Sequence, residues 1–465
     1  MTIDPFTPAH RMAELVRSGA VTSQSITLMF LERIERLNPD LNAFTDVTAD
    51  RALSQSREID RAVAEGNVPG PLAGVPFAVK NLFDVEGLPT RAGSMINRDR
   101  RPALRDALLV ERLVQAGAVL LGALNMGEYA YDFTGENAHD GACRNPHDLS
   151  HMAGGSSSGS GAATAAGLSP VSLGSDTNGS IRVPSSLCGI FGLKPTFGRL
   201  PRTGTFPFCD SLDHLGPLAR TSHDLALTYD VLQGLHATEA SHDCPRSQPT
   251  LPTLDQGIDG LRVVIAGGHF DTAGMDEAAG AVRVVAQALG AKETVDVDGA
   301  AEARAAAFLI TNGESAAFHL DRLKTRAMDF DPETRDRFLA GALLPAAWLI
   351  QAQRVRRWFH DKMMDLFQDV DLVIAPATPC PAPLVGQTTL PLRGETVALR
   401  PNLGLFTQPI SCVGLPVVTV PVWSGQLPIG VQLIAAPWRE ELCLRVARAL
   451  EMTGVAIANP PRGPH

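Results

Sequence analysis

Apolar residues recur at intervals of three and four along the first 66 positions of the chain, a spacing that places them on one face of a helix. The pattern predicts three helices, over residues 8–18, 23–37 and 50–65. Ser23 or Ser25 is the expected cap of the second helix, and Gly66 is the expected end of the third. Residues 1–66 are therefore interpreted as an N-terminal helical region.

Beyond residue 66 the pattern changes to short apolar runs, rich in β-branched residues, that alternate with helical segments. The predicted strands are residues 75–79, 119–121, 170–173, 261–266, 371–374, 417–422 and 429–434. Helices are predicted over residues 106–116, 222–232 and, with Pro345 as an interruption, 300–367. Because strands that alternate with helices build a sheet covered by helices on both faces, we expect an α/β fold.

The chain is interpreted as one domain, because only the Pro-, Ser- and Asp-rich stretch 236–260 has the composition of a surface connection. Within this domain, residues 1–66 are the N-terminal helices and residues 67–235 form a glycine- and serine-rich region expected to be catalytic. Residues 236–465 supply the rest of the sheet, with a helical insertion. A length of 465 residues is compatible with a single large α/β domain.

The composition, 45% hydrophobic and 19% charged, indicates a compact globular protein. A net charge of −10 and 5% aromatic residues argue against direct nucleic-acid binding, which needs a basic surface and stacking rings. Seven cysteines without a C-x-x-C pair predict reduced thiols, and the chain shows neither an N-terminal signal pattern nor an apolar run of membrane-spanning length. We expect a cytoplasmic protein that does not enter membranes.

Two glycine-rich turns with serines, residues 154–159 and 174–182, follow a lysine in an apolar stretch, Lys80. The first turn lacks the lysine that a nucleotide-binding loop places before its Ser or Thr. It also fits G-x-S-x-G, the nucleophile elbow of α/β-hydrolases, with Asp213 and His214 as partners. That elbow needs a preceding strand, whereas residues 145–151 have the composition of a loop.

A purely structural interpretation, in which small residues only allow close packing, does not explain the second turn. Its consecutive backbone N–H groups can point at one spot beside a hydroxyl, which is the requirement of an oxyanion hole. Four segments then resemble, in order, the motifs of the amidase signature family: GVPFAVKN at 74–81, GGSS at 154–157, DTNGSIRVP at 176–184 and GLKPT at 192–196. The resemblance implies a large twisted mixed sheet in a single amidase domain, and hydrolysis of linear amides through a seryl acyl-enzyme.

The resemblance assigns a catalytic triad to Lys80, Ser156 and Ser180, with a cis peptide bond at Ser156 and with Ser180 as the nucleophile. It also assigns the oxyanion hole to the backbone N–H groups of four consecutive residues, Thr177, Asn178, Gly179 and Ser180. The chemistry is coherent, because burial lowers the pKa of a lysine and an uncharged amine can accept a proton from a serine. No metal or cofactor is expected for this reaction.

Other residues are candidates for contact with the substrate or for a structural role. The substrate candidates are Tyr131, Ser157, Asn178, Arg202 and Arg337, the two arginines as anchors for an anionic substrate. Arg182 is expected to be a structural anchor that pairs with Asp176 or a nearby carbonyl, and not a substrate ligand. His139, Cys143, His147 and His151 recur at steps of four, as metal ligands on a helix would, but Gly141 and Pro146 interrupt any such helix.

The segments 125–137, 405–412 and 435–440 are similar to those of the carboxybiuret hydrolase branch of the family, which acts in cyanuric acid degradation. This similarity implies a small polar amide substrate, release of ammonia, and a small helical subunit like the C subunit of the tRNA-dependent amidotransferase in a homo- or hetero-oligomer. Three alternatives stay open: the glutaminase (A) subunit of that amidotransferase, a general aliphatic amidase, and a scaffold without catalysis.

Overall fold

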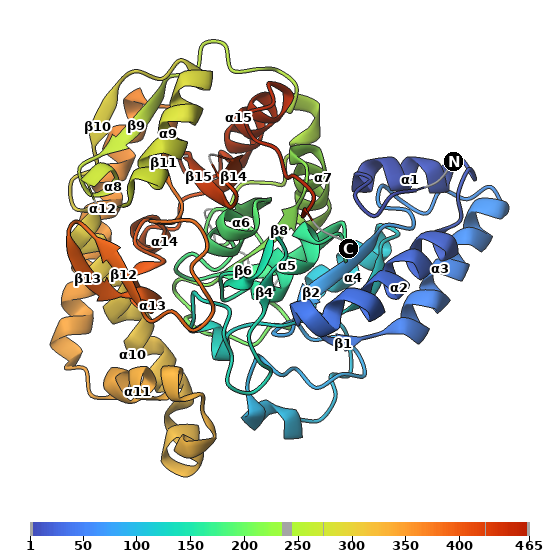
Figure 1. Ribbon diagram of the computed structural model, residues 1–465, viewed down its shortest axis with the longest axis horizontal. Coiled ribbons are helices and arrows are strands. Elements are labelled where there is room, and N and C mark those ends of the chain that lie inside the picture. The colour runs from blue at the N-terminus through green and yellow to red at the C-terminus, as the bar shows by residue number, and fades with distance from the viewer. Residues whose placement is uncertain (1–2, 235–243, 273, 424, 463–465) are drawn as a thin grey trace.

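Eleven strands form one mixed sheet in the part of the chain that the computed structural model describes, residues 3–234, 244–272, 274–423 and 425–462 (Figure 1). They lie in the order β1, β3, β2, β6, β8, β7, β14, β15, β11, β9, β10, and β4–β5 and β12–β13 are separate hairpins. The strands are β1 Phe44–Val47, β2 Pro76–Lys80, β3 Val119–Leu124, β4 Arg144–Asn145, β5 Asp148–Met152, β6 Val171–Asp176, β7 Phe191–Lys194, β8 His214–Ala219, β9 Val263–Gly267, β10 Thr294–Asp296, β11 Leu372–Pro376, β12 Thr389–Leu392, β13 Glu395–Ala398, β14 Val417–Trp423 and β15 Pro428–Ile434. The predicted α/β fold with a large mixed sheet is confirmed.

Helices cover both faces of this sheet. They are α1 Ala9–Arg17, α2 Ser23–Leu41, α3 Ala49–Ala64, α4 Leu108–Gln115, α5 Ser158–Ala165, α6 Arg182–Cys188, α7 Ser222–Leu232, α8 His269–Thr272, α9 Asp276–Leu289, α10 Ala300–Arg326, α11 Pro332–Ala342, α12 Ala346–Asp369, α13 Leu399–Asn402, α14 Gln408–Cys412 and α15 Glu440–Met452. α5 and α6 pack together on one face, and α4, α7, α15 and α9 form a row on the other. This arrangement follows from the crossovers, since β2–α4–β3 and β3–α5–β6 run in opposite directions along the sheet and such connections are right-handed.

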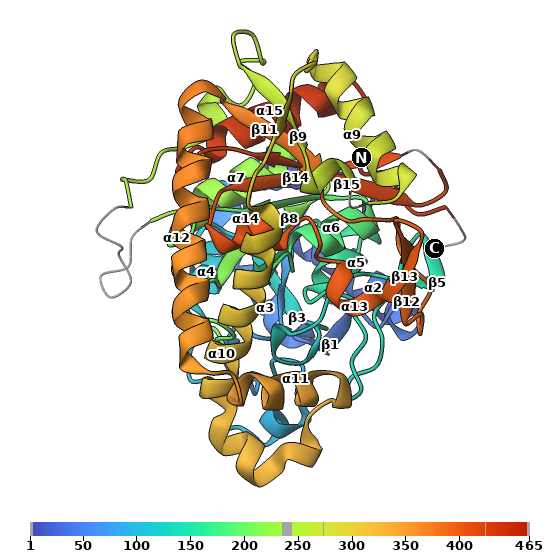
Figure 2. The same ribbon diagram turned by 90° about the vertical axis from the view of Figure 1, so that its left-hand side faces the viewer.

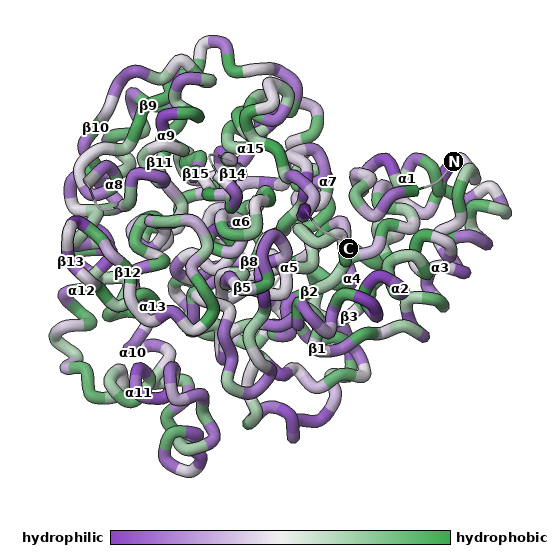
Figure 3. Tube along the Cα trace, viewed as in Figure 1, coloured by the Kyte–Doolittle hydropathy of each residue, from purple (hydrophilic) through white to green (hydrophobic). Residues whose placement is uncertain are grey.

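The core lies between the sheet and its helices. The residues of β15 are all buried, and those of β14 are buried up to the last one, Trp423. On outer helices such as α3, hydrophilic and hydrophobic residues alternate along the chain, as Figure 3 shows, and only the residues on one side are buried. This contrast is expected where central strands are covered on both faces and outer helices on one.

The three predicted N-terminal helices are confirmed, with two differences. The cap of α2 is Thr22, whose hydroxyl accepts the Ser25 N–H at 3.1 Å, and not Ser23 or Ser25 as predicted. α2 also continues four residues further than predicted, to Leu41, and ends where Asn42 adopts a positive φ of 53°. Strand β1, which the sequence pattern did not reveal, pairs with β3 at the edge of the sheet.

Two strands at the centre of the sheet, β7 and β8, were not predicted. β7 is short and contains Gly192, and β8 contains Gly216 and Pro217, so neither has a β-branched apolar run. The prediction of a loop over 145–151 is wrong, because β4 and β5 form a small antiparallel hairpin there, outside the main sheet. Residues 236–243 of the predicted surface connection lie outside the described residues.

The helices predicted over residues 300–367 are confirmed as α10, α11 and α12, and Pro345 stands at the start of α12. Figure 2 shows these helices together on one flank of the molecule, where α10 contacts α11, α12 and α14. Within the described residues, no helix combines the length and the apolar character that crossing a membrane requires.

Candidate active site

Lys80 lies at the end of β2 with its amine inside the protein, and its side chain is 0% exposed. Its Nζ is 2.7 Å from Ser156 Oγ and 2.9 Å from Ser175 Oγ. Ser156 belongs to the turn before α5, and Ser175 lies on β6, the neighbour of β2 in the sheet. The sheet therefore places the buried amine of Lys80 next to two serine hydroxyls.

The two glycine-rich turns lie against each other. The peptide bond between Gly155 and Ser156 is cis, as the family resemblance implied. The Gly155 N–H donates to the Phe133 carbonyl at 2.8 Å, and the Ser157 N–H donates to the Ser180 carbonyl at 3.3 Å. The segments of Lys80, Ser156 and Ser180 are thus brought to one place.

The turn from Thr177 to Ser180 presents four consecutive buried backbone N–H groups. Among the hydrogen bonds of the described residues, none uses the N–H of Thr177, Asn178, Gly179 or Ser180. Gly179 has a φ of 141°, and a Cβ there would collide with the Thr407 side chain, so the turn requires glycine at this position. Such unused donors can stabilise an oxyanion, at about 3 kcal/mol for each donor in comparable sites.

An ion pair between Arg182 and Asp176 holds the second glycine-rich turn, residues 174–182, in place. Arg182 donates to the Asp176 carboxylate through Nε and Nη2, both at 3.0 Å, and its Nη1 donates to Gln432 Oε1 at 2.7 Å. Burial raises the pKa of Asp176, but the charge and hydrogen bonds of Arg182, together with the charges of Lys194 and His214, outweigh burial and leave that pKa below its usual range. Arg182 is therefore the structural anchor that the sequence predicted.

The protein lowers the pKa of Lys80 to about 7, and burial is the main cause. The carboxylates of Asp213, Asp176 and Asp132 act in the opposite direction without cancelling it. A substantial fraction of the amine is therefore uncharged near neutral pH, and an uncharged amine beside Ser156 Oγ can accept a proton.

Three of the predicted substrate candidates, Tyr131, Asn178 and Arg337, line one small cavity of about 20 Å³ together with Ser180. The Arg337 guanidinium lies 3.6 Å from the centroid of the Tyr131 ring, and its Nη1 donates to the Tyr131 carbonyl at 2.7 Å. Arg337 on α11 is thereby placed at the wall of the cavity that Ser180 shares.

The other two candidates lie elsewhere. Arg202 lines a neighbouring cavity of about 300 Å³ that Ser175 also lines, and it donates to the Asp210 carbonyl at 2.8 Å. The Ser157 hydroxyl donates to the Ser175 carbonyl at 3.1 Å and accepts the Ser175 N–H at 3.2 Å. Ser157 therefore joins the first turn to β6.

Sequence reasoning missed two residues that the structure places at the site. Ser175 is the second hydrogen-bond partner of Lys80, and Thr311 on α10 accepts the Asn178 side-chain N–H at 2.8 Å at the cavity wall. The position of Ser175 directly before the DTNGS motif was a usable signal for its role. Thr311 carried no signal, because it lies in an ordinary helix more than a hundred positions away.

The alternative interpretations find no matching geometry among the described residues. The His214 ring lies by the carbonyls of Asp176 and Leu212, and Asp213 accepts the Thr177 hydroxyl, so neither acts on the serine of the G-x-S-x-G motif. His139 lies 3.0 Å from the Glu128 carboxylate, while His147 lies 2.9 Å from the carbonyl of Cys188. In the part of the chain that the structure describes, the group with metal-ligand spacing is a different one, His10, His223 and Asp224.

Comparisons with known proteins agree with this geometry. The sequence profile of the Amidase family matches residues 25–444. AtzE of 1-carboxybiuret hydrolase, a subunit from Pseudomonas sp. strain ADP, is 53% identical over 447 residues, which cover 95% of this chain and 98% of that protein. The A subunit of glutamyl-tRNA(Gln) amidotransferase from Chromohalobacter salexigens is 36% identical over 471 residues, covering 95% of each chain.

Among solved structures, one described as an unexpected vestigial protein complex, which reveals the evolutionary origins of an s-triazine catabolic enzyme, superposes with a TM-score of 0.96. It is 52% identical, and the match covers 97% of this chain and 100% of that one. Similarity along the whole chain, together with a buried lysine between serines, gives one conclusion. This chain belongs to the amidase signature family and is an amidohydrolase that acts on C–N amide bonds.

Proposed function

We propose that this amidohydrolase hydrolyses 1-carboxybiuret, with Lys80, Ser156 and Ser180 as its catalytic triad and with ammonia as a product. The observation that carries the proposal is the Lys80 amine, fully buried at 2.7 Å from Ser156 Oγ beside a turn of unused backbone N–H groups. The choice of substrate is supported by 53% identity to a protein named for that activity, over nearly the full length of both chains.

In the proposed reaction, uncharged Lys80 accepts the Ser156 hydroxyl proton while Ser156 takes the proton of Ser180. Ser180 Oγ attacks the terminal amide carbonyl, and the N–H groups of residues 177–180 stabilise the oxyanion. The C–N bond then breaks, and the proton returns through Ser156 to the departing nitrogen, which leaves as ammonia. Water attacks the acyl-enzyme by the same relay, so that the carboxylate product leaves and Ser180 regains its proton.

The cavity that Ser180 shares supports a polar, anionic substrate. Arg337 brings a positive charge to its wall, and Asn178 brings a side-chain amide whose other hydrogen-bonding end stays unpaired among the described residues. Arg337 is therefore proposed to bind the carboxylate of the substrate, with Tyr131 and Asn178 beside it. Arg202, in the neighbouring cavity, has the weaker position for this role.

The proposal includes a small helical partner protein. The 53% identical relative is named as one subunit of its enzyme, and the 52% identical solved structure is described as a protein complex. On α12, Trp348 and Ile350 are 56% and 57% exposed, beside a groove of about 640 Å³ that Ile350, Arg354, Arg357 and His360 line. This apolar and basic groove, on a chain of net charge −10, suits a helix whose apolar residues are flanked by carboxylates, so the partner is proposed to dock there.

The test of the activity compares ammonia release from 1-carboxybiuret, L-glutamine and a simple aliphatic amide by the purified chain, with and without a co-expressed small helical partner. We expect preferential turnover of 1-carboxybiuret and none by Ser180→Ala. Preferential turnover of glutamine would identify the amidotransferase activity instead, and turnover by Ser180→Ala would refute the nucleophile. Light scattering with Ile350→Glu tests the docking groove, since an unchanged complex would exclude it.

A further inference from the structure

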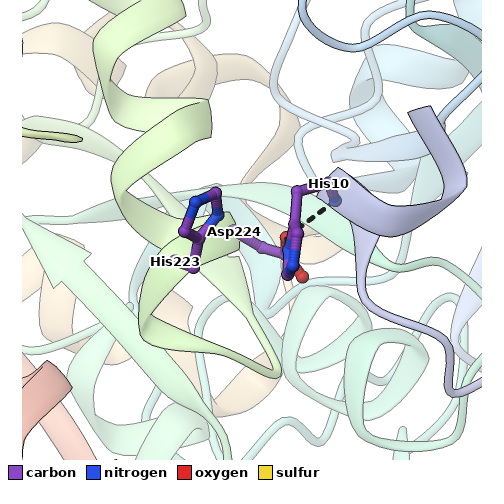
Figure 4. A group of neighbouring side chains, drawn as sticks. All are labelled: His10, His223 and Asp224. Atoms are coloured by element: carbon purple, nitrogen blue, oxygen red, sulfur yellow. Dashed lines mark hydrogen bonds and ion pairs between the residues drawn. The ribbon is translucent and has the colours of Figure 1, made fainter. Parts of the chain in front are cut away.

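A second group of reactive side chains lies outside the active site, where α1 meets α7. It consists of His10 on α1 and of His223 and Asp224 at the start of α7 (Figure 4). Each side chain offers one metal-ligand atom, and these three atoms lie within 4.8 Å of one another. The group joins segments more than two hundred positions apart, so local sequence does not explain it.

Part of this group is accounted for by ordinary hydrogen bonds. The Asp224 carboxylate accepts the backbone N–H groups of Ala9 and His10 at 2.8 and 2.9 Å, and so caps α1. His10 Nδ1 lies 2.7 Å from Asp224 Oδ1, within hydrogen-bond distance. A single hydrogen bond between the imidazole and the carboxylate therefore accounts for the contact between these two side chains.

His223 is not accounted for in this way. Its Nδ1 is buried and has no hydrogen-bond partner among the described residues. Its ring centroid lies 4.2 Å from that of His10. An imidazole with a buried unpaired nitrogen, next to a second imidazole and a carboxylate, is a donor set that a divalent cation satisfies.

We propose that His10, His223 and Asp224 bind a divalent transition metal ion of the Zn²⁺ type, which fastens α1 to α7. The ion replaces the proton between His10 and Asp224, and His223 supplies the third ligand, which leaves a fourth position for water. The His10 side chain is 31% exposed, so the ion has access from solvent, whereas Asp224 is 2% exposed and holds its oxygen in place. The role is structural and separate from amide hydrolysis.

The test is calorimetric titration of the untagged full-length protein with ZnCl₂. We expect one ion per chain, a rise in Tm with Zn²⁺, and a heat of binding that depends on the ionisation enthalpy of the buffer, because a proton is released. His223→Ala removes one ligand and leaves the cap of α1 intact, so it should weaken binding at least about tenfold while amidase activity is unchanged. His360→Ala, a half-exposed histidine on α12, is the matched control and should bind as the natural protein does.

Three results would overturn the proposal: no binding at millimolar Zn²⁺, equal affinity in His223→Ala, or equal weakening in His360→Ala. Should His223→Ala fold poorly, the visible spectrum of the Co²⁺-loaded natural protein decides the matter, since a site of imidazole and carboxylate ligands gives strong tetrahedral absorption bands. A spectrum of hexahydrated Co²⁺ under those conditions would refute the site.

Discussion

The Lys80 amine lies at a position that is unfavourable for a charge, and its low pKa follows from that position. A fall in pKa from 10.5 to about 7 corresponds to about 5 kcal/mol, at 1.36 kcal/mol for each tenfold change in acidity. The charges of three carboxylates act against this fall in the pKa of Lys80. The low pKa therefore depends on the complete burial of the amine between β2, β6 and the cis-peptide turn. Under the proposed mechanism, this single side chain is a base that works without histidine.

The first prediction concerns the dependence of the rate on pH. The free base of Lys80 accepts the proton, so kcat/KM should rise with pH and level off above about 7, the pKa of the amine. Initial rates of ammonia release between pH 5.5 and about 9 measure this midpoint. Lys80→Arg keeps a charge that does not titrate in this range and should be inactive at every pH, whereas a rate that falls as pH rises through 7 would contradict the proposed base.

The second prediction separates a positioning role for Ser175 from a merely structural one. Lys80 Nζ donates to Ser175 Oγ at 2.9 Å and lies 2.7 Å from Ser156 Oγ, and we expect the bond to Ser175 to orient the uncharged amine with its lone pair toward Ser156. In Ser175→Ala the ammonium form loses an acceptor, so the midpoint of the pH–rate profile should move to lower pH and kcat should fall about tenfold. Ser175→Thr keeps the hydroxyl and should restore both, and a lower rate with an unmoved midpoint would reduce Ser175 to a packing role.

Helices far along the chain complete the site. α10 brings Thr311 to Asn178, and α11 brings Arg337 onto Tyr131, so the insertion forms one wall of the cavity that Ser180 shares. A buried carboxylate fastens this wall, since Glu128 accepts the Asp331 N–H at 2.8 Å and the Thr334 hydroxyl at 2.5 Å at the start of α11. These two hydrogen bonds to Glu128 fix the start of α11 relative to the loop that carries Tyr131.

Elements and site residues could be predicted where they depend on the local sequence, and could not where they depend on packing against distant segments. Strands such as β14 and β15 were found because they are continuous apolar runs, whereas β8 owes its place to neighbours on both sides and contains Gly216 and Pro217. The positions of the proposed triad followed from the motif resemblance. Thr311 could not be predicted, because its role depends on how α10 packs and not on the residues beside it.

The third prediction tests the wall formed by α11. Arg337→Gln removes the positive charge at the wall of the cavity that Ser180 shares, so KM for 1-carboxybiuret should rise about tenfold to a hundredfold while kcat changes little, as expected for a lost charged hydrogen bond of about 1.5 to 3 kcal/mol. Arg202→Gln is the matched control in the neighbouring cavity and should leave KM within about twofold. The reverse ranking of the two variants would assign the anchor to Arg202.

The molecule as a whole keeps three large cationic side chains fully buried among the described residues, Lys80, Arg182 and Lys194. Arg182 is neutralised by Asp176, and Lys194 donates to the carbonyls of Pro195 and Leu415. Within the part of the chain that the structure describes, Lys80 has only hydroxyl groups as side-chain hydrogen-bond partners, at 2.7 and 2.9 Å. Burial lowers the pKa of both Lys80 and Lys194 to about 7, so the folded state carries a cost at each lysine, and we propose that the cost at Lys80 serves catalysis.

The fourth prediction is that Lys80→Met abolishes turnover and yet raises Tm at pH 7. Between the folded pKa of about 7 and the unfolded value of 10.5, the unfolded chain binds more protons at Lys80, so the natural protein gains stability as pH rises through this range. At pH 7 the penalty has an upper limit of about 5 kcal/mol, from which the loss of two hydrogen bonds subtracts about 2 kcal/mol. The Tm advantage of Lys80→Met should thus be positive at pH 7 and shrink toward pH 10, as thermal unfolding at both pH values will show. Ser180→Ala should be equally inactive but keeps Lys80, so it should retain the pH dependence of the natural protein. A Tm of Lys80→Met below that of the natural protein at pH 7 would mean that the buried amine stabilises the fold after all.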